Sequence, residues 1–254
     1  MVVAGAVLLT ALVLWLMVYH VPSAYRPAVL AGPKQEEGMR KLVNHISLFG
    51  TLAGRGRPFT WSITAEQANE YLGSMDAIAA LADRPGAVSA ALERAGLAGP
   101  AVAMREGILT VMVRSRRRGV VLSVDLAFDF DAAGDLAIRA VAARVGALPL
   151  SEETLAGRVG QVRRRLGRLL EQARKDRGAR LGPVRLGELT GLLGALMKMI
   201  DGQRVRPEIV WPICKHRVRI RRVEITEGRL TLHVVPVERR GAGATSARRP
   251  AGGG

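Results

Sequence analysis

The sequence predicts an α+β protein in which a transmembrane helix and a helical neck precede an antiparallel sheet covered by a long helix. Three observations predict this class. Residues 2–21 carry no charged side chain, residues 120–130 place apolar side chains at alternate positions, and residues 152–177 repeat apolar side chains at helical spacing. We expect four parts: a transmembrane anchor (1–21), a stalk and juxtamembrane helix (22–59), an α+β domain (60–237) and a disordered basic tail (238–254).

The N-terminal apolar run is long enough for a bilayer. At about 1.5 Å per helical residue it reaches roughly 30 Å, the thickness of the hydrocarbon core. Trp15 and Tyr19 lie near its C-terminal end, where aromatic rings favour the level of the headgroups. No clean A-x-A cleavage site follows the run. We therefore expect a retained signal anchor, rather than a cleaved signal peptide, in a single-pass protein of the cell membrane.

Helices are predicted before the first strands. Residues 34–48 are expected to form the juxtamembrane helix after a stalk rich in proline and glycine. Thr64 and Gln67 have the spacing of a capping box, which predicts a second helix over residues 64–82. A third, short helix is expected over residues 85–96.

Strands follow these helices. Glu106-Gly107 and Glu227-Gly228 each predict a two-residue hairpin turn. The strand over residues 120–130 is predicted to have one dry face. Its polar side chains and those of the next turn are interpreted as a wet face rather than a cation site; they include Asp125, Asp129, Asp131 and Asp135. A change of apolar parity between Ile220 and Val223 predicts a β-bulge.

Two later helices are predicted to complete the domain. The amphipathic helix over residues 152–177 is expected to cover the dry face, formed by Leu122, Val124, Leu126 and Phe128. The helix over residues 186–200 is too short to span a bilayer comfortably, so it is expected to be buried or to lie against lipid. Its apolar side chains are candidate ligand-binding residues in a groove: Leu189, Leu193, Leu196, Met197 and Ile200.

The sequence contains no catalytic motif that we can identify. It lacks the nucleophile elbow, the P-loop and the H-E-x-x-H pattern, and its four histidines lie on unrelated predicted elements. We therefore expect no enzyme, no cofactor and no metal. The net charge is +16. The basic run Arg116, Arg117 and Arg118 is a candidate contact for anionic headgroups. Nucleic acid is an unlikely partner, because aromatic residues make up only 4% of the chain.

Three segments resemble one family. Ile63–Leu72, Val145–Leu150 and the hairpin over residues 218–237 resemble motifs of YpmS-like, membrane-anchored bacterial proteins. This group is similar to tubular lipid-binding domains, in which a curved sheet wraps a long helix. The resemblance implies an α+β fold with one N-terminal transmembrane helix, then a curved antiparallel sheet packed on a long amphipathic helix. It implies no catalytic residues.

The resemblance also implies an extracytoplasmic domain. The basic residues that follow the anchor oppose this orientation, because the positive-inside rule places such residues in the cytoplasm. We follow the resemblance. The resulting expectation is a non-enzymatic domain that binds a lipid or other apolar ligand at the cell envelope. The alternative is a structural or assembly partner of an envelope protein complex.

Overall fold

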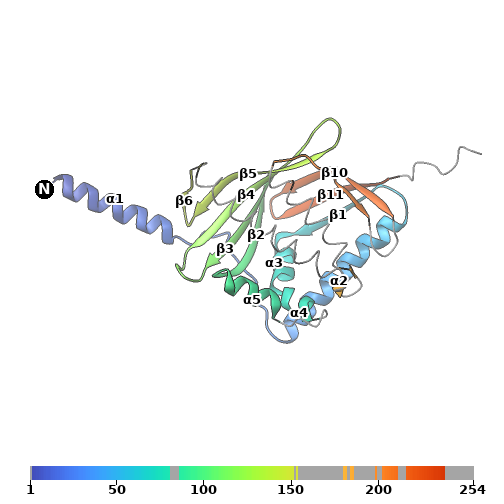
Figure 1. The fold of residues 1–254 in the computed structure, drawn as a ribbon, viewed down its shortest axis with the longest axis horizontal. Coiled ribbons are helices and arrows are strands. Elements are labelled where there is room, and N and C mark those ends of the chain that lie inside the picture. Colours follow the sequence, from blue (N-terminus) through green and yellow to red (C-terminus); the bar gives the residue numbers. More distant parts are fainter. Residues whose placement is uncertain are drawn as a thin grey trace, which may run out of the picture.

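The computed structural model describes residues 2–80, 86–151, 153, 180–181, 184–185, 198, 202–210 and 216–237. In this part of the chain, two antiparallel sheets lie end to end, with helices along them (Figure 1). The helices are α1 (Val2–Tyr19), α2 (Pro33–Gly54), α3 (Ala65–Gly73), α4 (Met75–Ala80) and α5 (Ala87–Arg94).

This architecture corrects the predicted fold class. Two separate antiparallel sheets replace the single curved sheet. The described residues contain no long amphipathic helix that follows the strands and packs on them. The helix predicted over residues 152–177 and the tail over residues 238–254 lie outside the described residues.

The predicted transmembrane helix is also corrected. Among the residues whose side chains are described, no helix is both long and apolar enough to cross a membrane. A membrane span needs about 20 apolar residues, whereas α1 has 18 residues.

The larger sheet has the strand order β2-β3-β4-β5-β6. Its strands are β2 (Leu97–Arg105), β3 (Ile108–Ser115), β4 (Val121–Phe130), β5 (Leu136–Val145) and β6 (Leu148–Pro149). The predicted Glu106-Gly107 turn is confirmed between β2 and β3. Each neighbour in this sheet is also a neighbour in sequence, so the sheet is built from local hairpins.

The burial of β4 differs from what the sequence pattern predicts, because residues of the expected wet face are buried. Val121, Ser123 and Asp125 are buried, whereas the apolar side chains expected to form a dry face are only half-buried: Leu122, Val124, Leu126 and Phe128. The interpretation of Asp125 as a wet-face residue is therefore wrong. Its carboxylate is satisfied across the sheet, by the Thr110 hydroxyl at 2.8 Å and by Arg144 Nη2 at 2.7 Å.

The stalk covers part of this buried face. Tyr25 packs on a small core cluster formed by Ala101, Met112 and Val121. Its hydroxyl donates a hydrogen bond to the Gly99 carbonyl oxygen at 2.8 Å. Burial raises the pKa of Tyr25, and the nearby positive charge of Arg114 opposes this only in part. The stalk is thus packed on the sheet rather than free of it.

The smaller sheet has the strand order β1-β11-β10-β9. Its strands are β1 (Phe59–Thr64), β9 (Glu208–Val210), β10 (Arg217–Thr226) and β11 (Arg229–Pro236). The predicted bulge is confirmed as a register shift between Ile220 and Arg222. A further two-stranded sheet pairs β7 (Arg180–Leu181) with β8 (Val184–Arg185).

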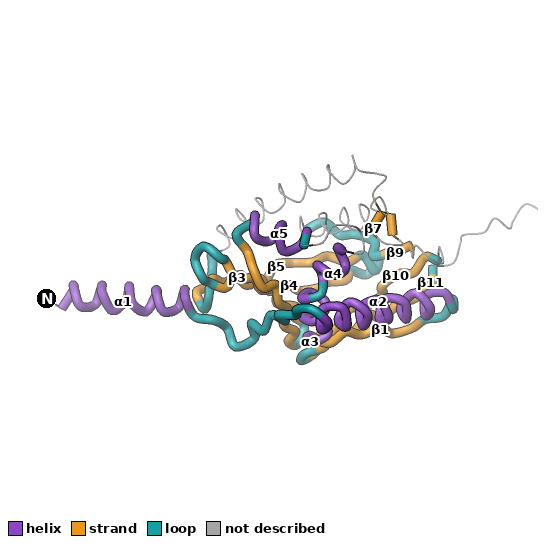
Figure 2. Tube along the Cα trace, turned by 90° about the horizontal axis from the view of Figure 1, so that it is seen from below, coloured by secondary structure: helices purple, strands orange, loops and turns teal. Residues whose placement is uncertain are grey.

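Helix α2 lies along β1 and covers the apolar face of the smaller sheet (Figure 2). Phe49 and Ala53 pack against Val218 and Val234 in a buried cluster. The Phe49 ring meets the Trp61 ring at a centroid distance of 5.8 Å and nearly edge-on. This cluster forms the core of the smaller sheet.

Short helices connect the two sheets. The predicted capping box of Thr64 and Gln67 is confirmed at the start of α3. Asn69 of α3 forms two hydrogen bonds with the backbone of Val102 in β2, at 2.7 and 2.9 Å. The helix predicted over residues 64–82 is interrupted at Ser74, so that α3 and α4 are separate.

The two sheets join through backbone hydrogen bonds. The Gly107 N–H donates to the Ile225 carbonyl oxygen at 2.9 Å, and the Gly228 N–H donates to the Met104 carbonyl oxygen at 3.0 Å. The turn between β2 and β3 therefore interlocks with the turn between β10 and β11. A second link is the isolated bridge between Leu136 and Val205.

Candidate functional site

Helix α1 exposes a set of large apolar side chains between Leu9 and Tyr19. It projects from the body of the protein in both views (Figures 1 and 2). Seven of its large apolar side chains are between 45% and 63% exposed: Leu9, Leu12, Val13, Leu14, Trp15, Leu16 and Tyr19. Singly exposed apolar residues are normal on a protein surface, but a contiguous set of this kind marks an interaction site.

The C-terminal end of α1 is fixed to the larger sheet. The Ala147 N–H donates a hydrogen bond to the Met17 carbonyl oxygen at 2.7 Å. The neighbouring Gly146 has a φ of +62°, and a Cβ atom there would meet the backbone of Met17 and Val18. Only glycine therefore allows the turn between β5 and β6 to approach α1 so closely.

Two aromatic rings mark this end of α1. The rings of Trp15 and Tyr19 have a centroid distance of 5.0 Å and an interplanar angle of 43°. Aromatic rings with a polar atom favour the boundary between headgroups and acyl chains. A position at the headgroup level stays a prediction, and the structure shows that the two rings lie beside each other.

The basic run of the sequence forms the turn between β3 and β4. Arg116, Arg117 and Arg118 are all exposed there, and their contact with anionic headgroups stays a prediction. The Gly119 N–H closes the turn by donating to the Ser115 carbonyl oxygen at 2.8 Å. Arg116 forms an ion pair with Glu93 of α5 at 2.9 Å. We call residues 114–118 the arginine turn.

The arginine turn lies at the same end of the larger sheet as the attachment of α1. Val121 begins β4 directly after the turn, and its carbonyl oxygen accepts a hydrogen bond from the Gly146 N–H at 2.7 Å. Gly146 and Ala147 in turn contact the last residues of α1. This juxtaposition depends on the pairing of β4 with β5, and no local sequence signal predicts it.

The predicted apolar groove lies outside the described residues. This applies to all five of its candidate ligand-binding residues: Leu189, Leu193, Leu196, Met197 and Ile200. The ligand-binding role of these residues stays a prediction.

A cleft of about 900 Å³ lies between the stalk, α3 and β2. Arg26 and Lys41 line it, and so do Glu66, Glu70 and Glu227. Hydrogen bonds from Lys41 to Glu70 and Glu37, at 2.8 and 3.1 Å, raise the pKa of Lys41. Because both acidic and basic groups line it, the cleft has no charge of one sign that would favour an anionic or a cationic ligand.

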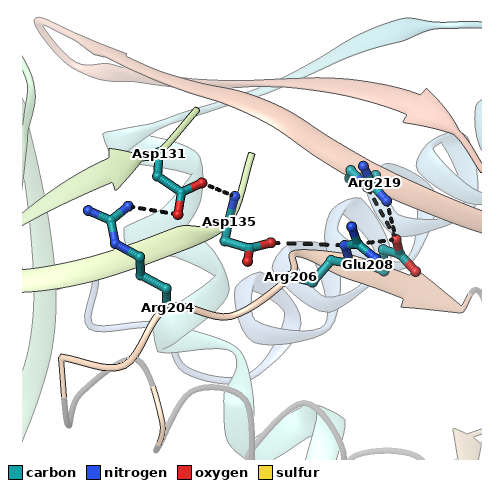
Figure 3. A network of polar contacts seen from close by, with 6 residues as sticks. All are labelled: Asp131, Asp135, Arg204, Arg206, Glu208 and Arg219. Carbon is teal, nitrogen blue, oxygen red and sulfur yellow. Dashed lines mark hydrogen bonds and ion pairs between the residues drawn. The ribbon is translucent and has the colours of Figure 1, made fainter. Parts of the chain in front are cut away.

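Polar side chains form a second cluster where the turn between β4 and β5 meets β9 (Figure 3). Arg204 contacts Asp131 at 3.3 Å, and Arg206 lies 3.9 Å from Asp135 and 3.7 Å from Glu208. The backbone N–H of Asp135 lowers the pKa of Asp131 most, and the charge of Arg204 adds to this effect. Each carboxylate of the cluster faces an arginine, so its role is to join the two sheets.

The described residues offer no metal centre. In this part of the chain, no group of three or more His, Cys, Asp or Glu side chains is placed to hold a metal ion. His233 lies on the polar face of β11, and its Nε2 is 3.1 Å from Glu224 Oε2. This contact with His233 lowers the pKa of Glu224.

The chain was also compared with known proteins. Comparisons with protein-family models, with curated proteins and with solved structures find no match, so the resemblance to YpmS-like proteins stays a prediction.

Proposed function

We propose that this protein is a non-enzymatic domain that associates with a membrane and binds lipid at the cell envelope, on the extracytoplasmic side. The observation that carries the proposal is the exposed apolar surface of α1. Burying a large apolar side chain fully stabilises by roughly 1.5–3 kcal/mol. Seven such side chains that are about half exposed therefore represent on the order of 5–10 kcal/mol that a non-aqueous neighbour recovers.

Lipid fits α1 better than a protein groove does. Successive helical residues point about 100° apart, so the five residues from Leu12 to Leu16 cover all sides of the helix. Every one of them is a large apolar residue and exposed. An amphipathic helix in a protein groove presents one apolar face and keeps a polar one. Acyl chains, in contrast, surround a helix on every side.

Quenching of tryptophan fluorescence by brominated acyl chains tests the proposal. We would compare two full-length variants that each keep one described tryptophan. The first carries Trp61→Phe and Trp211→Phe and keeps Trp15 on α1. The second carries Trp15→Phe and Trp211→Phe and keeps Trp61. Phenylalanine is a mild replacement at position 61, because the buried indole N–H of Trp61 has no described hydrogen-bond partner.

We expect vesicles with brominated chains to quench Trp15 and to leave Trp61 unchanged, because Trp61 packs between His45 and Phe49. Equal quenching of both variants, or of neither, would contradict the proposal. The alternative is a structural or assembly partner of an envelope complex. It predicts that Trp15 remains unquenched in vesicles and becomes protected when the full-length chain is purified with its partner protein.

A further inference from the structure

The arginine turn places several positive charges at the base of α1. Four of its five residues are arginines, and the Nε of Arg114 donates to the Gly119 carbonyl oxygen at 3.2 Å, inside the turn. Glu93 is the described carboxylate that contacts the turn, and it pairs with Arg116 across the surface. No described residue pairs with Arg117 or Arg118. Within the part of the chain that the structure describes, these two guanidinium groups are exposed and unpaired.

The position of the arginine turn relative to the membrane surface follows from its connection to α1. Two backbone hydrogen bonds connect the end of α1, the turn between β5 and β6, and the start of β4. Trp15 and Tyr19 belong to the same end of the helix. When the apolar side chains of α1 contact acyl chains, these rings lie at the headgroup level. The arginine turn then lies at the membrane surface, beside the headgroups.

We propose that the arginine turn binds the phosphates of anionic phospholipid headgroups and gives the protein a preference for anionic membranes. This inference rests on the proposed function, because it requires α1 to contact the membrane. A guanidinium donates two parallel hydrogen bonds to a phosphate, and it is less strongly hydrated than an ammonium group. The partner is therefore the lipid phosphate at the surface, not a ligand in the neutralised cleft near α3.

The size of the effect follows from the number of charges. Each arginine near an anionic surface contributes roughly a fivefold gain in membrane partitioning, and three contribute on the order of a hundredfold. Arg116 contributes less than the others, because Glu93 already partly neutralises it. The gain falls as salt increases, since the screening length is about 10 Å at 0.1 M salt.

The test is co-flotation of the full-length chain with two kinds of vesicle. One is phosphatidylcholine alone, and the other is phosphatidylcholine mixed with phosphatidylglycerol. The test variant carries Arg116→Gln, Arg117→Gln and Arg118→Gln. The matched control carries Arg217→Gln, Arg221→Gln and Arg229→Gln, which remove the same charge from exposed positions on the smaller sheet, away from α1.

We expect the wild-type chain and the control to prefer the anionic vesicles by the same factor, and the test variant to lose between ten- and a hundredfold of that preference. Equal losses in both variants would show a general charge effect and overturn the inference. Displacement by inorganic phosphate at matched ionic strength would assign the site to free phosphate and overturn it as well. Absence of the wild-type chain from both kinds of vesicle would instead overturn the proposed function.

A single charge reversal gives a second measurement, which does not depend on the triple variant folding. Arg117→Glu changes one exposed side chain, so circular dichroism should match the wild type. Its preference for anionic vesicles should be lower at low salt and should converge with the wild type at high salt. A salt-independent difference would contradict an electrostatic contact.

Discussion

The buried carboxylate of Asp125 offers a sharp test of the larger sheet. Asp125 is 3% exposed, and its side chain accepts hydrogen bonds from Thr110 at 2.8 Å, Arg144 at 2.7 Å and Arg105 at 3.3 Å. The substitution Asp125→Ala removes the acceptor from all three donors at once. It leaves the hydroxyl of Thr110, a residue that is 5% exposed, without the carboxylate that accepts its hydrogen bond.

The cost can be worked out group by group. A buried hydroxyl that loses its acceptor costs about 1–3 kcal/mol. The side chains of Arg105 and Arg144 are 55% and 35% exposed, so water replaces the lost carboxylate and each pair contributes at most about 1 kcal/mol. We therefore expect Asp125→Ala to lower the free energy of unfolding by about 2–4 kcal/mol, rather than by the ~5 kcal/mol of a fully buried pair.

The matched control is Asp129→Ala on the same strand. The Asp129 side chain is 47% exposed and lies 3.8 Å from Arg139, so its loss should cost less than about 1 kcal/mol. Urea unfolding of the full-length chain, followed by circular dichroism, measures both values. Equal costs for the two substitutions would refute the buried network. In addition, Thr110→Val should reduce the cost of Asp125→Ala, because it removes the hydroxyl that would be left unpaired.

Three further predictions follow from other parts of the fold. Gly146→Ala should lower the thermal midpoint of unfolding more than Gly134→Ala does. Both glycines have a positive φ, so both substitutions strain the backbone. A Cβ atom at position 134 meets nothing within 4 Å, whereas one at position 146 meets the backbone of α1. Burial raises the pKa of Asp76, but hydrogen bonds from Ser89 and the adjacent backbone outweigh it and lower that pKa. The stability contributed by Asp76 is thus complete above about pH 4 and is lost as the pH falls through the lowered pKa of the folded state. The urea midpoint of Asp76→Ala should therefore converge with that of the wild type in acid. A phosphatase fusion after Val237 should be active, because the domain is proposed to be extracytoplasmic; an inactive phosphatase together with a fluorescent cytoplasmic fusion would contradict that orientation.

Local signals in the sequence predicted local features of the fold. The capping box at Thr64, the hairpin turn at Gly107 and the bulge after Ile220 each depend on residues within one short segment. The division into two sheets could not be predicted in this way. It depends on β1 pairing with β11, roughly 170 residues later in the sequence, instead of with a neighbouring strand.

The buried face of β4 shows a second limit of pattern reading. Alternation of apolar and polar residues identified the strand but wrongly assigned Ser123 and Asp125 to a solvated face. The reason is that Asp125 is buried together with partners from two other strands, Thr110 and Arg144, which a single-strand pattern does not contain. The exposure of Arg116–Arg118 could be predicted from the sequence, because water solvates the charges of a surface turn and no distant partner has to be known. Its position beside α1 depends on contacts of Gly146 that are distant in sequence.

The pairing of β1 with β11 has a consequence for how the chain is made. The larger sheet consists of successive hairpins, so it can assemble as soon as residues up to about 150 have left the ribosome. The smaller sheet cannot, because β1 must wait for a partner roughly 170 residues downstream. At 5–20 residues per second, that wait lasts roughly 10–30 seconds. During biosynthesis, β1 therefore lacks its strand partner for this interval, and Phe59 and Trp61 can pack only on α2, which precedes them in sequence.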